Sequence, residues 1–208
     1  MIVVSTPTGN IGSQLLPHLL AAGEQVRVIA RDPSKLPSDV RDRVEVVQGA
    51  SDDPAVIDQA LAGADALFWV VPPSFQISDV PAHYLDFTRP AVAAIKAHGV
   101  KHVVSVSSLG RKLGMKAGVV SAAHAMEALL ESSGAHHRGL WCPSFMDNTL
   151  RQLYPIKHQG AFYLPNAADL KVPHACTRDI AATAAKLLLD RSWSGPGGVA
   201  VMGPEDLS

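Results

Sequence analysis

The chain has 208 residues, of which 47% are hydrophobic and 18% are charged, so its length fits one large domain and its composition supports a buried core. The formal net charge of −1 argues against a basic surface that binds nucleic acid directly or attracts anionic lipid. Two cysteines without CxxC spacing, Cys142 and Cys176, predict reduced thiols in a cytoplasmic protein. No leader pattern opens the chain and no apolar run reaches the roughly 18 residues of a membrane span, so we expect neither a signal peptide nor a membrane contact.

Short apolar runs alternate with segments of helical period along most of the chain. This alternation predicts an α/β fold with a doubly wound parallel sheet and crossover helices. The expected strands are residues 1–5, 25–30, 44–48, 66–71, 102–107 and 138–142, and the expected helices are residues 10–22, 54–61, 84–98 and 117–133. After Pro143 we expect a short helix at 147–153, a helix from Arg178 with Thr177 as its N-cap, and a last strand at 198–203.

The turn between the first strand and the first helix reads STPTGNIG, residues 5–12. A strand, a glycine-rich turn and a helix in this order favour a phosphate-binding turn, because the helix N-terminus offers free N–H groups and a positive dipole end. Gly9 would let the backbone approach a pyrophosphate, and Gly12 would let the helix pack closely on the strand. Ser5 and Thr6 stand where the first glycine of the fingerprint is usual. The alternative is an ordinary strand–helix turn that contains two glycines.

The residues after the second strand discriminate between the two nicotinamide dinucleotides. An acidic side chain there would accept a hydrogen bond from the ribose 2′-hydroxyl, whereas an arginine would pair with a 2′-phosphate. The chain has Arg31 directly after the strand and Lys35 four residues later, while Asp32 comes one position late. We therefore expect NADP(H) rather than NAD(H), with Arg31 and Lys35 on the adenosine phosphate. The alternative is that Arg31 is a solvated strand end.

An ordered set of motifs resembles the NmrA-like branch of the atypical short-chain dehydrogenase/reductases. The motifs are STPTGNIG, IARDPSK, AGADALFWVVPP, GVKHVVSVSSLG, HAMEALLESSG and CPSFMDNTL. The resemblance covers nearly the whole chain and implies an NAD(P)-binding Rossmann fold with strand order 3-2-1-4-5-6. It also implies a small, shortened C-terminal substrate lobe, which we expect within residues 144–175 of a single domain, 1–208.

The resemblance also implies which residues contact the cofactor. Those expected on the dinucleotide turn are Thr6, Thr8, Gly9, Asn10, Ile11 and Gly12. Those expected beside the adenine and ribose are Val71 and Pro72, and those expected around the nicotinamide are Ser107, Ser108, His124, Pro143, Ser144 and Phe145. The family more often has arginine before the proline of the last group, where this chain has Cys142.

The chain lacks the Tyr-x-x-x-Lys pair with which short-chain dehydrogenases protonate a carbonyl oxygen, because none of Tyr84, Tyr154 and Tyr163 has a lysine four residues later. We expect His124 and Ser107 to be the catalytic candidates. His124 would act as a proton donor or as a ligand of the nicotinamide ribose, and a plain surface histidine is the alternative. No metal-binding spacing and no GxSxG elbow occurs in the sequence.

Three functions are consistent with these patterns. The first is an NADPH-dependent oxidoreductase that reduces a small carbonyl, quinone or related unsaturated compound. The second is a non-catalytic NADP(H) sensor that binds a regulatory protein partner, which the missing Tyr-x-x-x-Lys pair favours. The third is an isomerase or lyase of the same fold. A homodimer is compatible with each of them.

Overall fold

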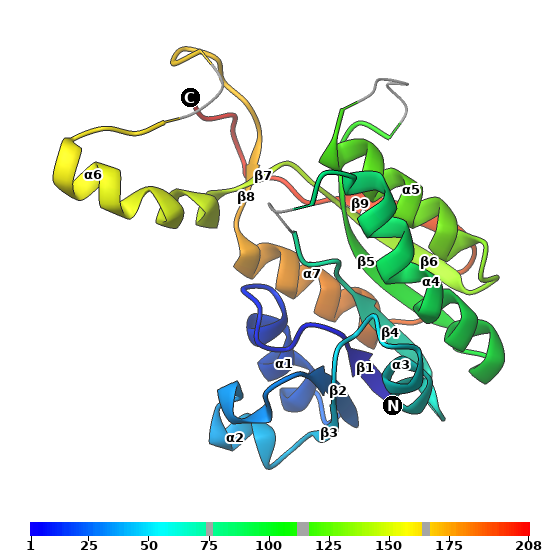
Figure 1. Cartoon of the computed structure of the whole chain (residues 1–208). Helices are drawn as coiled ribbons and strands as arrows, with labels where there is room; N and C mark the ends of the chain where they lie inside the picture. The colour runs from blue at the N-terminus through cyan, green and yellow to red at the C-terminus, as the bar shows by residue number, and fades with distance from the viewer. Residues whose placement is uncertain (74–76, 112–116, 164–166) are drawn as a thin grey trace.

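The computed structural model describes residues 1–73, 77–111, 117–163 and 167–208, and within them seven parallel strands form one sheet in the order β3-β2-β1-β4-β5-β6-β9 (Figure 1). These strands are β1 (Ile2–Val4), β2 (Val26–Ala30), β3 (Glu45–Gln48), β4 (Ala66–Trp69), β5 (His102–Ser108), β6 (His136–Cys142) and β9 (Pro196–Ala200). The doubly wound parallel sheet and the order of its first six strands are as expected.

Helices cover both faces of this sheet, with α1 and α7 on one face and α3, α4 and α5 on the other (Figure 1). The α-helices are α1 (Gly12–Ala21), α2 (Ser38–Arg41), α3 (Pro54–Leu61), α4 (Val80–His98), α5 (Val119–Glu131), α6 (Leu153–Gln159) and α7 (Thr177–Leu189). Two 3₁₀ helices are η1 (Pro33–Lys35) and η2 (Met146–Gln152).

The apolar strands supply two separate cores because successive side chains point to opposite faces. In β1, Ile2 and Val4 pack in the core under α1 and α7, whereas Val3 packs in the core under α3, α4 and α5. In β4, Phe68 and Trp69 divide between the two cores in the same way. The central strands β1 and β4 are therefore buried on both faces.

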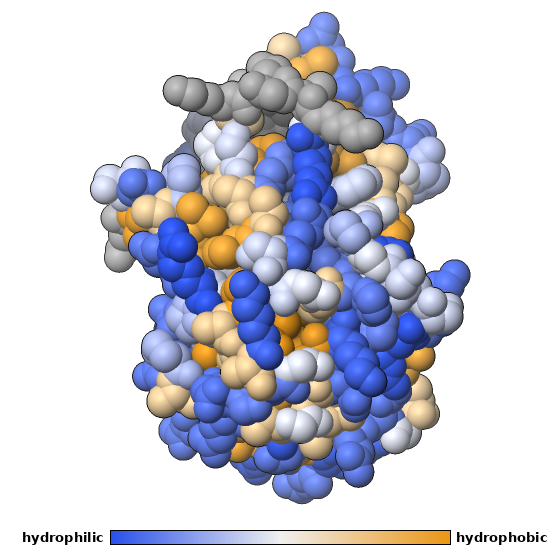
Figure 2. Space-filling view, turned by 90° about the vertical axis from the view of Figure 1, so that its right-hand side faces the viewer, coloured by the Kyte–Doolittle hydropathy of each residue, from blue (hydrophilic) through white to orange (hydrophobic). Residues whose placement is uncertain are grey.

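The outer surface on the side of α4 and α5 mixes hydrophilic and hydrophobic residues, with no type covering the whole face (Figure 2). Within the described ranges, no helix combines the length and the apolar character that crossing a bilayer requires.

Helix α4 begins four residues earlier than the sequence pattern predicts. The carboxylate of Asp79 accepts a hydrogen bond of 2.9 Å from the N–H of Ala82, and Pro81 lies in the first turn, where a missing N–H costs nothing. Together they start the helix at Val80 rather than Tyr84. The C-terminal end is as expected, at Gly99, which has a left-handed φ of 67°.

The segment after Pro143 differs most from the expected elements. The short helix predicted at 147–153 is the 3₁₀ helix η2, and helix α6 follows it directly. Thr177 is the first residue of α7 and Cys176 is its N-cap, so the prediction of Thr177 as the cap was wrong by one position. The last strand lies at 196–200 rather than 198–203, because it pairs with β6 from His137 to Trp141.

Two very short strands outside the main sheet complete the fold. Strand β7 (Ser144–Phe145) pairs in parallel with β8 (His174–Ala175) and so joins the chain before η2 to the chain before α7. A two-residue strand carries no periodicity, so the sequence pattern could not have shown this pair. The expected substrate lobe at 144–175 contains β7, η2, α6 and β8, while its residues 164–166 lie outside the described ranges.

Candidate functional site

A cavity of about 660 Å³ lies at the carboxyl ends of strands β1 to β4. Its lining comes from the loops after these strands, from the start of α4 and from η2. Ligands of open α/β sheets bind at this edge, where the strand order reverses, and here β1 stands between β2 and β4. The volume is within the range of roughly 300–1,000 Å³ that small-molecule and cofactor sites occupy.

The glycine-rich turn forms one wall of this cavity. All six turn residues named from the sequence line it: Thr6, Thr8, Gly9, Asn10, Ile11 and Gly12. A Cβ atom on Gly12 would lie only 2.0 Å from the carbonyl oxygen of Thr6, so the turn closes tightly because this residue is glycine. A Cβ on Gly9 would lie 3.5 Å from the same oxygen, which is an ordinary van der Waals contact. The turn therefore does not need glycine at this position to fold, and the missing side chain instead leaves space in the cavity. This open backbone at the start of α1 fits a pyrophosphate.

Ser5, which replaces the usual first glycine, ties three strand ends together. Its carbonyl oxygen accepts a hydrogen bond of 2.6 Å from the Ser51 hydroxyl, and its own hydroxyl oxygen accepts one of 3.2 Å from the N–H of Val70. Ser5 is buried, and no described residue other than glycine has a positive φ. The serine therefore stabilises the edge of the sheet without backbone strain.

Arg31 lines the cavity at the end of β2, as the sequence predicts for a contact with an adenosine phosphate. The neighbouring carboxylate is engaged elsewhere, because Asp32 accepts hydrogen bonds from the Ser34 hydroxyl at 2.6 Å and the Ser34 N–H at 3.1 Å. These bonds hold the pKa of Asp32 below its ordinary value. Lys35 ends the short helix that Asp32 caps and is not among the lining residues. Asp32 thus serves as a helix cap, and Arg31 is the residue of this segment whose charge faces the cavity.

A second wall of the cavity contains residues to which the sequence analysis gave no role at a site. They are His83 and Phe87 from α4, Asp147, Asn148 and Arg151 from η2, and Thr177 from α7, together with the expected Phe145. The ring of His83 lies 5.9 Å from that of Phe87, and its Nε2 atom lies 3.1 Å from the Pro72 carbonyl oxygen. This wall therefore offers aromatic surfaces beside polar and cationic groups.

A further group of lining residues follows β3. They are Gly49, Ala50, Ser51 and Asp52. The loop after β3 could have been found from the sequence, because the carboxyl ends of parallel strands share one edge.

The residues expected beside the adenine and ribose and around the nicotinamide divide into two sets. Pro72 and Phe145 line the cavity, whereas Val71 is buried beside it. Ser107, Ser108, His124, Pro143 and Ser144 are also not among the lining residues. The Nε2–H of His124 donates a hydrogen bond of 3.0 Å to the carbonyl oxygen of Ser108, which ties α5 to the end of β5. The structure thus brings His124 and Ser108 together.

Ser107 lies beside a buried carboxyl group that the sequence analysis missed. Glu127 is fully buried, and its Oε1 atom accepts a hydrogen bond of 3.0 Å from the Trp141 indole N–H. Burial raises the pKa of Glu127, although Ser107 and Trp141 both favour the charged form. Gly139 leaves room for this carboxyl, since a Cβ there would overlap Glu127 Oε1. Glu127 lies three residues after His124, and this helical spacing was the available signal.

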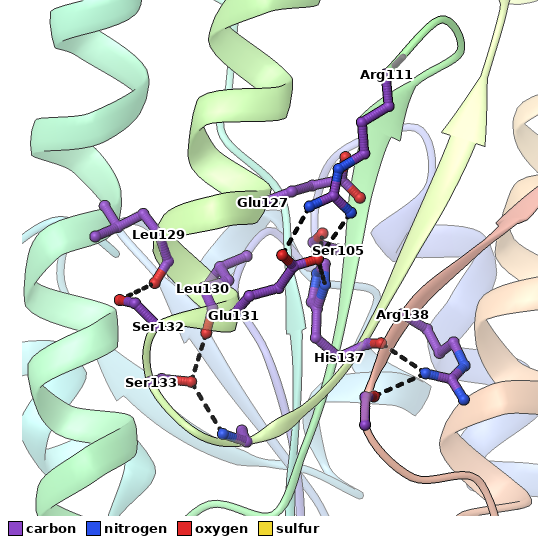
Figure 3. A network of polar contacts seen from close by, with 12 residues as sticks. Ser105, Arg111, Glu127, Leu129, Leu130, Glu131, Ser132, Ser133, His137 and Arg138 are labelled. Atoms are coloured by element: carbon purple, nitrogen blue, oxygen red, sulfur yellow. Dashed lines mark hydrogen bonds and ion pairs between the residues drawn. The ribbon is translucent and has the colours of Figure 1, made fainter.

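A second polar network lies between α5 and strands β5 and β6 (Figure 3). The guanidinium of Arg111 makes two hydrogen bonds of 2.7 Å to the carboxylate of Glu131. Glu131 in turn lies 3.7 Å from the Nδ1 atom of His137, whose Nε2 atom is 2.8 Å from the Ser105 hydroxyl. Burial lowers the pKa of His137 to about 4, so this histidine is neutral at pH 7. Ser105 and His137 are both fully buried, and the network therefore stabilises the sheet rather than facing a ligand.

The structure does not assemble a metal centre in the ranges it describes, where no three His, Cys, Asp or Glu side chains form a group that could hold an ion. Cys142 is buried under the sheet edge, and burial raises the pKa of its thiol to about 12. A thiol of this kind is inert as a nucleophile.

Comparison with known proteins agrees with this geometry. The family model described as NAD(P)H-binding matches residues 7–191. A (4-alkanoyl-5-oxo-2,5-dihydrofuran-3-yl)methyl phosphate reductase of Streptomyces griseus is 32% identical over all of this chain and 70% of its own length. An NAD(P)H azoreductase of Xenophilus azovorans is 27% identical over the same shares of the two chains.

The fold also matches a solved structure. The NADPH-dependent quinone oxidoreductase of Escherichia coli, crystallised with NADPH, superposes with a TM-score of 0.83 over 100% of this chain and 71% of that one, at 24% identity. At this identity the match concerns the fold alone. It extends from the dinucleotide turn to the last strand of the sheet.

Proposed function

The chain belongs to the NAD(P)H-binding family, and on that premise we propose that it is an NADPH-dependent oxidoreductase that reduces a small carbonyl, quinone or related unsaturated compound. The observation that carries this proposal is the single cavity that joins the glycine-rich turn and Arg31 to a wall with Phe87 and Phe145. Similarity to two reductases of small molecules supports it. Within the family we place the chain in the NmrA-like branch, as one domain with its substrate lobe at 144–175.

Each part of the cavity has a distinct task in this reaction. The N–H groups at the start of α1 would hold the pyrophosphate, and Arg31 would bind the 2′-phosphate. When bound, the cofactor supplies the hydride, so the protein contributes binding, orientation and exclusion of water. Phe87, Phe145 and the His83 ring form apolar and aromatic surfaces against which a flat unsaturated compound packs.

The proton donor differs from that of the short-chain dehydrogenases with a catalytic tyrosine. Tyr84 is buried, which raises the pKa of its hydroxyl, while Tyr154 and Tyr163 are exposed around α6. None of the three lines the cavity. We therefore propose that the proton for the reduced substrate comes from solvent or from His124. We also propose that the side chains of Ser107 and His124 lie beside the nicotinamide.

The decisive experiment measures two quantities on the same preparation. NADPH affinity is titrated by calorimetry, and NADPH oxidation is followed by the loss of its absorbance with a panel of quinones and ketones. Gly9→Asp serves as the control, because its charged side chain would occupy the phosphate position and should abolish both signals. Tight NADPH binding without oxidation by any compound would contradict the proposal and would favour the non-catalytic sensor.

A further inference from the structure

The segment formed by η2 and α6, residues 146–159, extends away from the body of the molecule (Figure 1). Neither helix contributes a buried residue, and Leu150 and Tyr154 are 61% and 68% exposed. A segment without a core of its own cannot set its orientation by internal packing. Its few attachments to the body must therefore fix where the cavity residues of η2 point.

One attachment is a chain of hydrogen bonds that begins at the dinucleotide turn. The Nε2 group of Gln14 donates to the carbonyl oxygen of Asn10 at 2.6 Å and to the hydroxyl oxygen of Thr177 at 2.8 Å. The Thr177 hydroxyl donates to Asp147 Oδ1 at 2.6 Å, and the Thr177 N–H donates to Asp147 Oδ2 at 2.9 Å. Three separate segments of the chain, the start of α1, η2 and the start of α7, thus meet at Thr177. We refer to Gln14, Thr177 and Asp147 as the threonine clamp.

The chemistry of the clamp makes it a firm attachment. Thr177 is 1% exposed, and it opens α7, whose N-cap Cys176 offers no side-chain hydrogen bond. The carboxylate of Asp147 supplies that missing cap from another segment, at the positive end of the helix. Burial opposes its charge, but the two bonds from Thr177 prevail and hold the pKa of Asp147 below its ordinary value. The hydrogen bonds are therefore charge-assisted, which is the stronger class.

A second attachment is slight by comparison. Strands β7 and β8 pair over only two positions, Ser144 with His174 and Phe145 with Ala175. That pair holds the chain just before η2 but not η2 itself. Asp147 lies at the beginning of η2, and Asn148 and Arg151, which line the cavity, follow it within the next four residues.

We propose that Gln14, Thr177 and Asp147 are positioning residues that fix η2 against the dinucleotide turn, so that Asn148 and Arg151 form the wall that contacts the substrate. This inference rests on the proposed function, which supplies the substrate that the wall contacts. The clamp itself does not depend on turnover. Asn148 and Arg151 together suit a compound that presents oxygen atoms to this wall. Loss of the clamp should weaken substrate binding more than cofactor binding, because the bond from Gln14 to Asn10 is retained when Thr177 is changed.

The first test compares variants that remove the clamp with matched controls. Thr177→Val removes the two bonds of the Thr177 hydroxyl, and Asp147→Asn replaces one of the two acceptor oxygens with an amide group and removes the charge, each with little change of shape. Thr177→Ser keeps the hydroxyl, and Thr183→Val removes a hydroxyl on the same helix that bonds to the Asp179 carbonyl and takes no part in the clamp. We expect the KM for a quinone to rise about tenfold in the two clamp variants, with the Kd of NADPH changed less than about threefold. Thr177→Ser, which keeps the clamp hydroxyl, should return the KM toward the wild-type value, and Thr183→Val should leave it unchanged.

The second test needs no catalytic activity. Lys157 is exposed on α6, and the rate of tryptic cleavage after it reports how often the segment detaches. We expect cleavage to be about tenfold faster in Thr177→Val and Asp147→Asn than in the wild type and the two controls. Equal cleavage rates would overturn the clamp as a positioning device.

The two tests separate the possible failures. Faster cleavage with an unchanged KM would show that the clamp holds η2 but that η2 is not the substrate wall, which overturns the inference. A wild type that oxidises no NADPH would remove the proposed function, and the cleavage rates would still decide whether the clamp fixes η2.

Discussion

The imidazole of His124 is tied to the backbone of Ser108, because its Nε2–H donates a hydrogen bond of 3.0 Å to the Ser108 carbonyl oxygen. One ring nitrogen is therefore committed to holding α5 against the end of β5. The Nδ1 atom is the nitrogen left to contact a nicotinamide ribose. This arrangement favours a role in cofactor binding over a role as general acid.

We predict that His124→Ala weakens NADPH binding, while kcat at saturating NADPH falls by less than about tenfold, since loss of a general acid typically costs a hundredfold or more. The measurements are the Kd of NADPH by calorimetry and kcat from the loss of NADPH absorbance. His124→Gln is the control, because its amide N–H can still reach the Ser108 carbonyl. A hundredfold fall in kcat with normal NADPH affinity would instead identify His124 as the proton donor, and wild-type values of both would remove it from the site.

The two glycines of the turn should respond differently to the same change. Gly9→Ala places a Cβ in ordinary contact with the Thr6 carbonyl, so we expect normal stability but at least about tenfold weaker NADPH binding, because the methyl group intrudes on the phosphate position. Gly12→Ala places a Cβ 2.0 Å from the same oxygen, so we expect unfolding to become easier by about 1–3 kcal/mol. Urea unfolding and calorimetry of both variants test this contrast. Equal loss of stability in the two variants would contradict it.

Cofactor choice should depend on Arg31. We predict that the wild type prefers NADPH over NADH and that Arg31→Ala removes the preference, with a loss of about 1.5–3 kcal/mol of NADPH binding and little change for NADH. The Kd values of both cofactors for both proteins provide the test. Asp32→Asn is the control at the neighbouring position. Asp32 caps η1, so this change should lower the stability of the protein more than it alters the choice of cofactor. Equal affinity of the wild type for both cofactors would refute the prediction.

The buried His137 should make the protein less stable in mild acid. Burial lowers the pKa of His137 in the folded state from the ordinary 6.5 to about 4. The nearby Glu131 raises this pKa, whereas the charges of Arg111 and Arg138 lower it further. Between these pH values the unfolded chain binds more protons, so stability present above pH 6.5 is lost as the pH falls toward 4. The loss from this residue is on the order of 3 kcal/mol at most.

The measurement is the free energy of unfolding in urea at several pH values, for the wild type and His137→Gln. Burial raises the pKa of Glu127, so the titration of Glu127 changes stability in the direction opposite to that of His137. Because Glu127 is present in both proteins, the difference between their pH curves isolates His137. We expect the wild type to lose more stability than the variant between pH 6.5 and 4. Parallel pH curves for the two proteins would exclude His137 as the cause.

Much of this protein is determined by features that are local in the sequence. Alternating apolar strands and amphipathic helices specify a parallel sheet, since each pattern depends only on residues a few positions apart. The glycine-rich turn and Arg31 likewise belong to short segments that follow predicted strands, and the structure places both at one cavity. The same local rules missed the early start of α4 at Val80, where the capping residue Asp79 precedes an apparently irregular stretch.

Only the tertiary structure decided the rest of the site. Thr177 and Asp147 are 30 residues apart and Thr177 and Gln14 are 163 apart, so no periodicity connects them. Likewise, Ser107 lies beside Glu127 because α5 packs over the strand that carries Ser107. Side-chain direction at a strand end depends on which helix covers that strand, and this is settled by burial of apolar area across the whole sheet. The sequence therefore determined the fold and the glycine-rich turn, whereas long-range packing determined which polar side chains line the cavity.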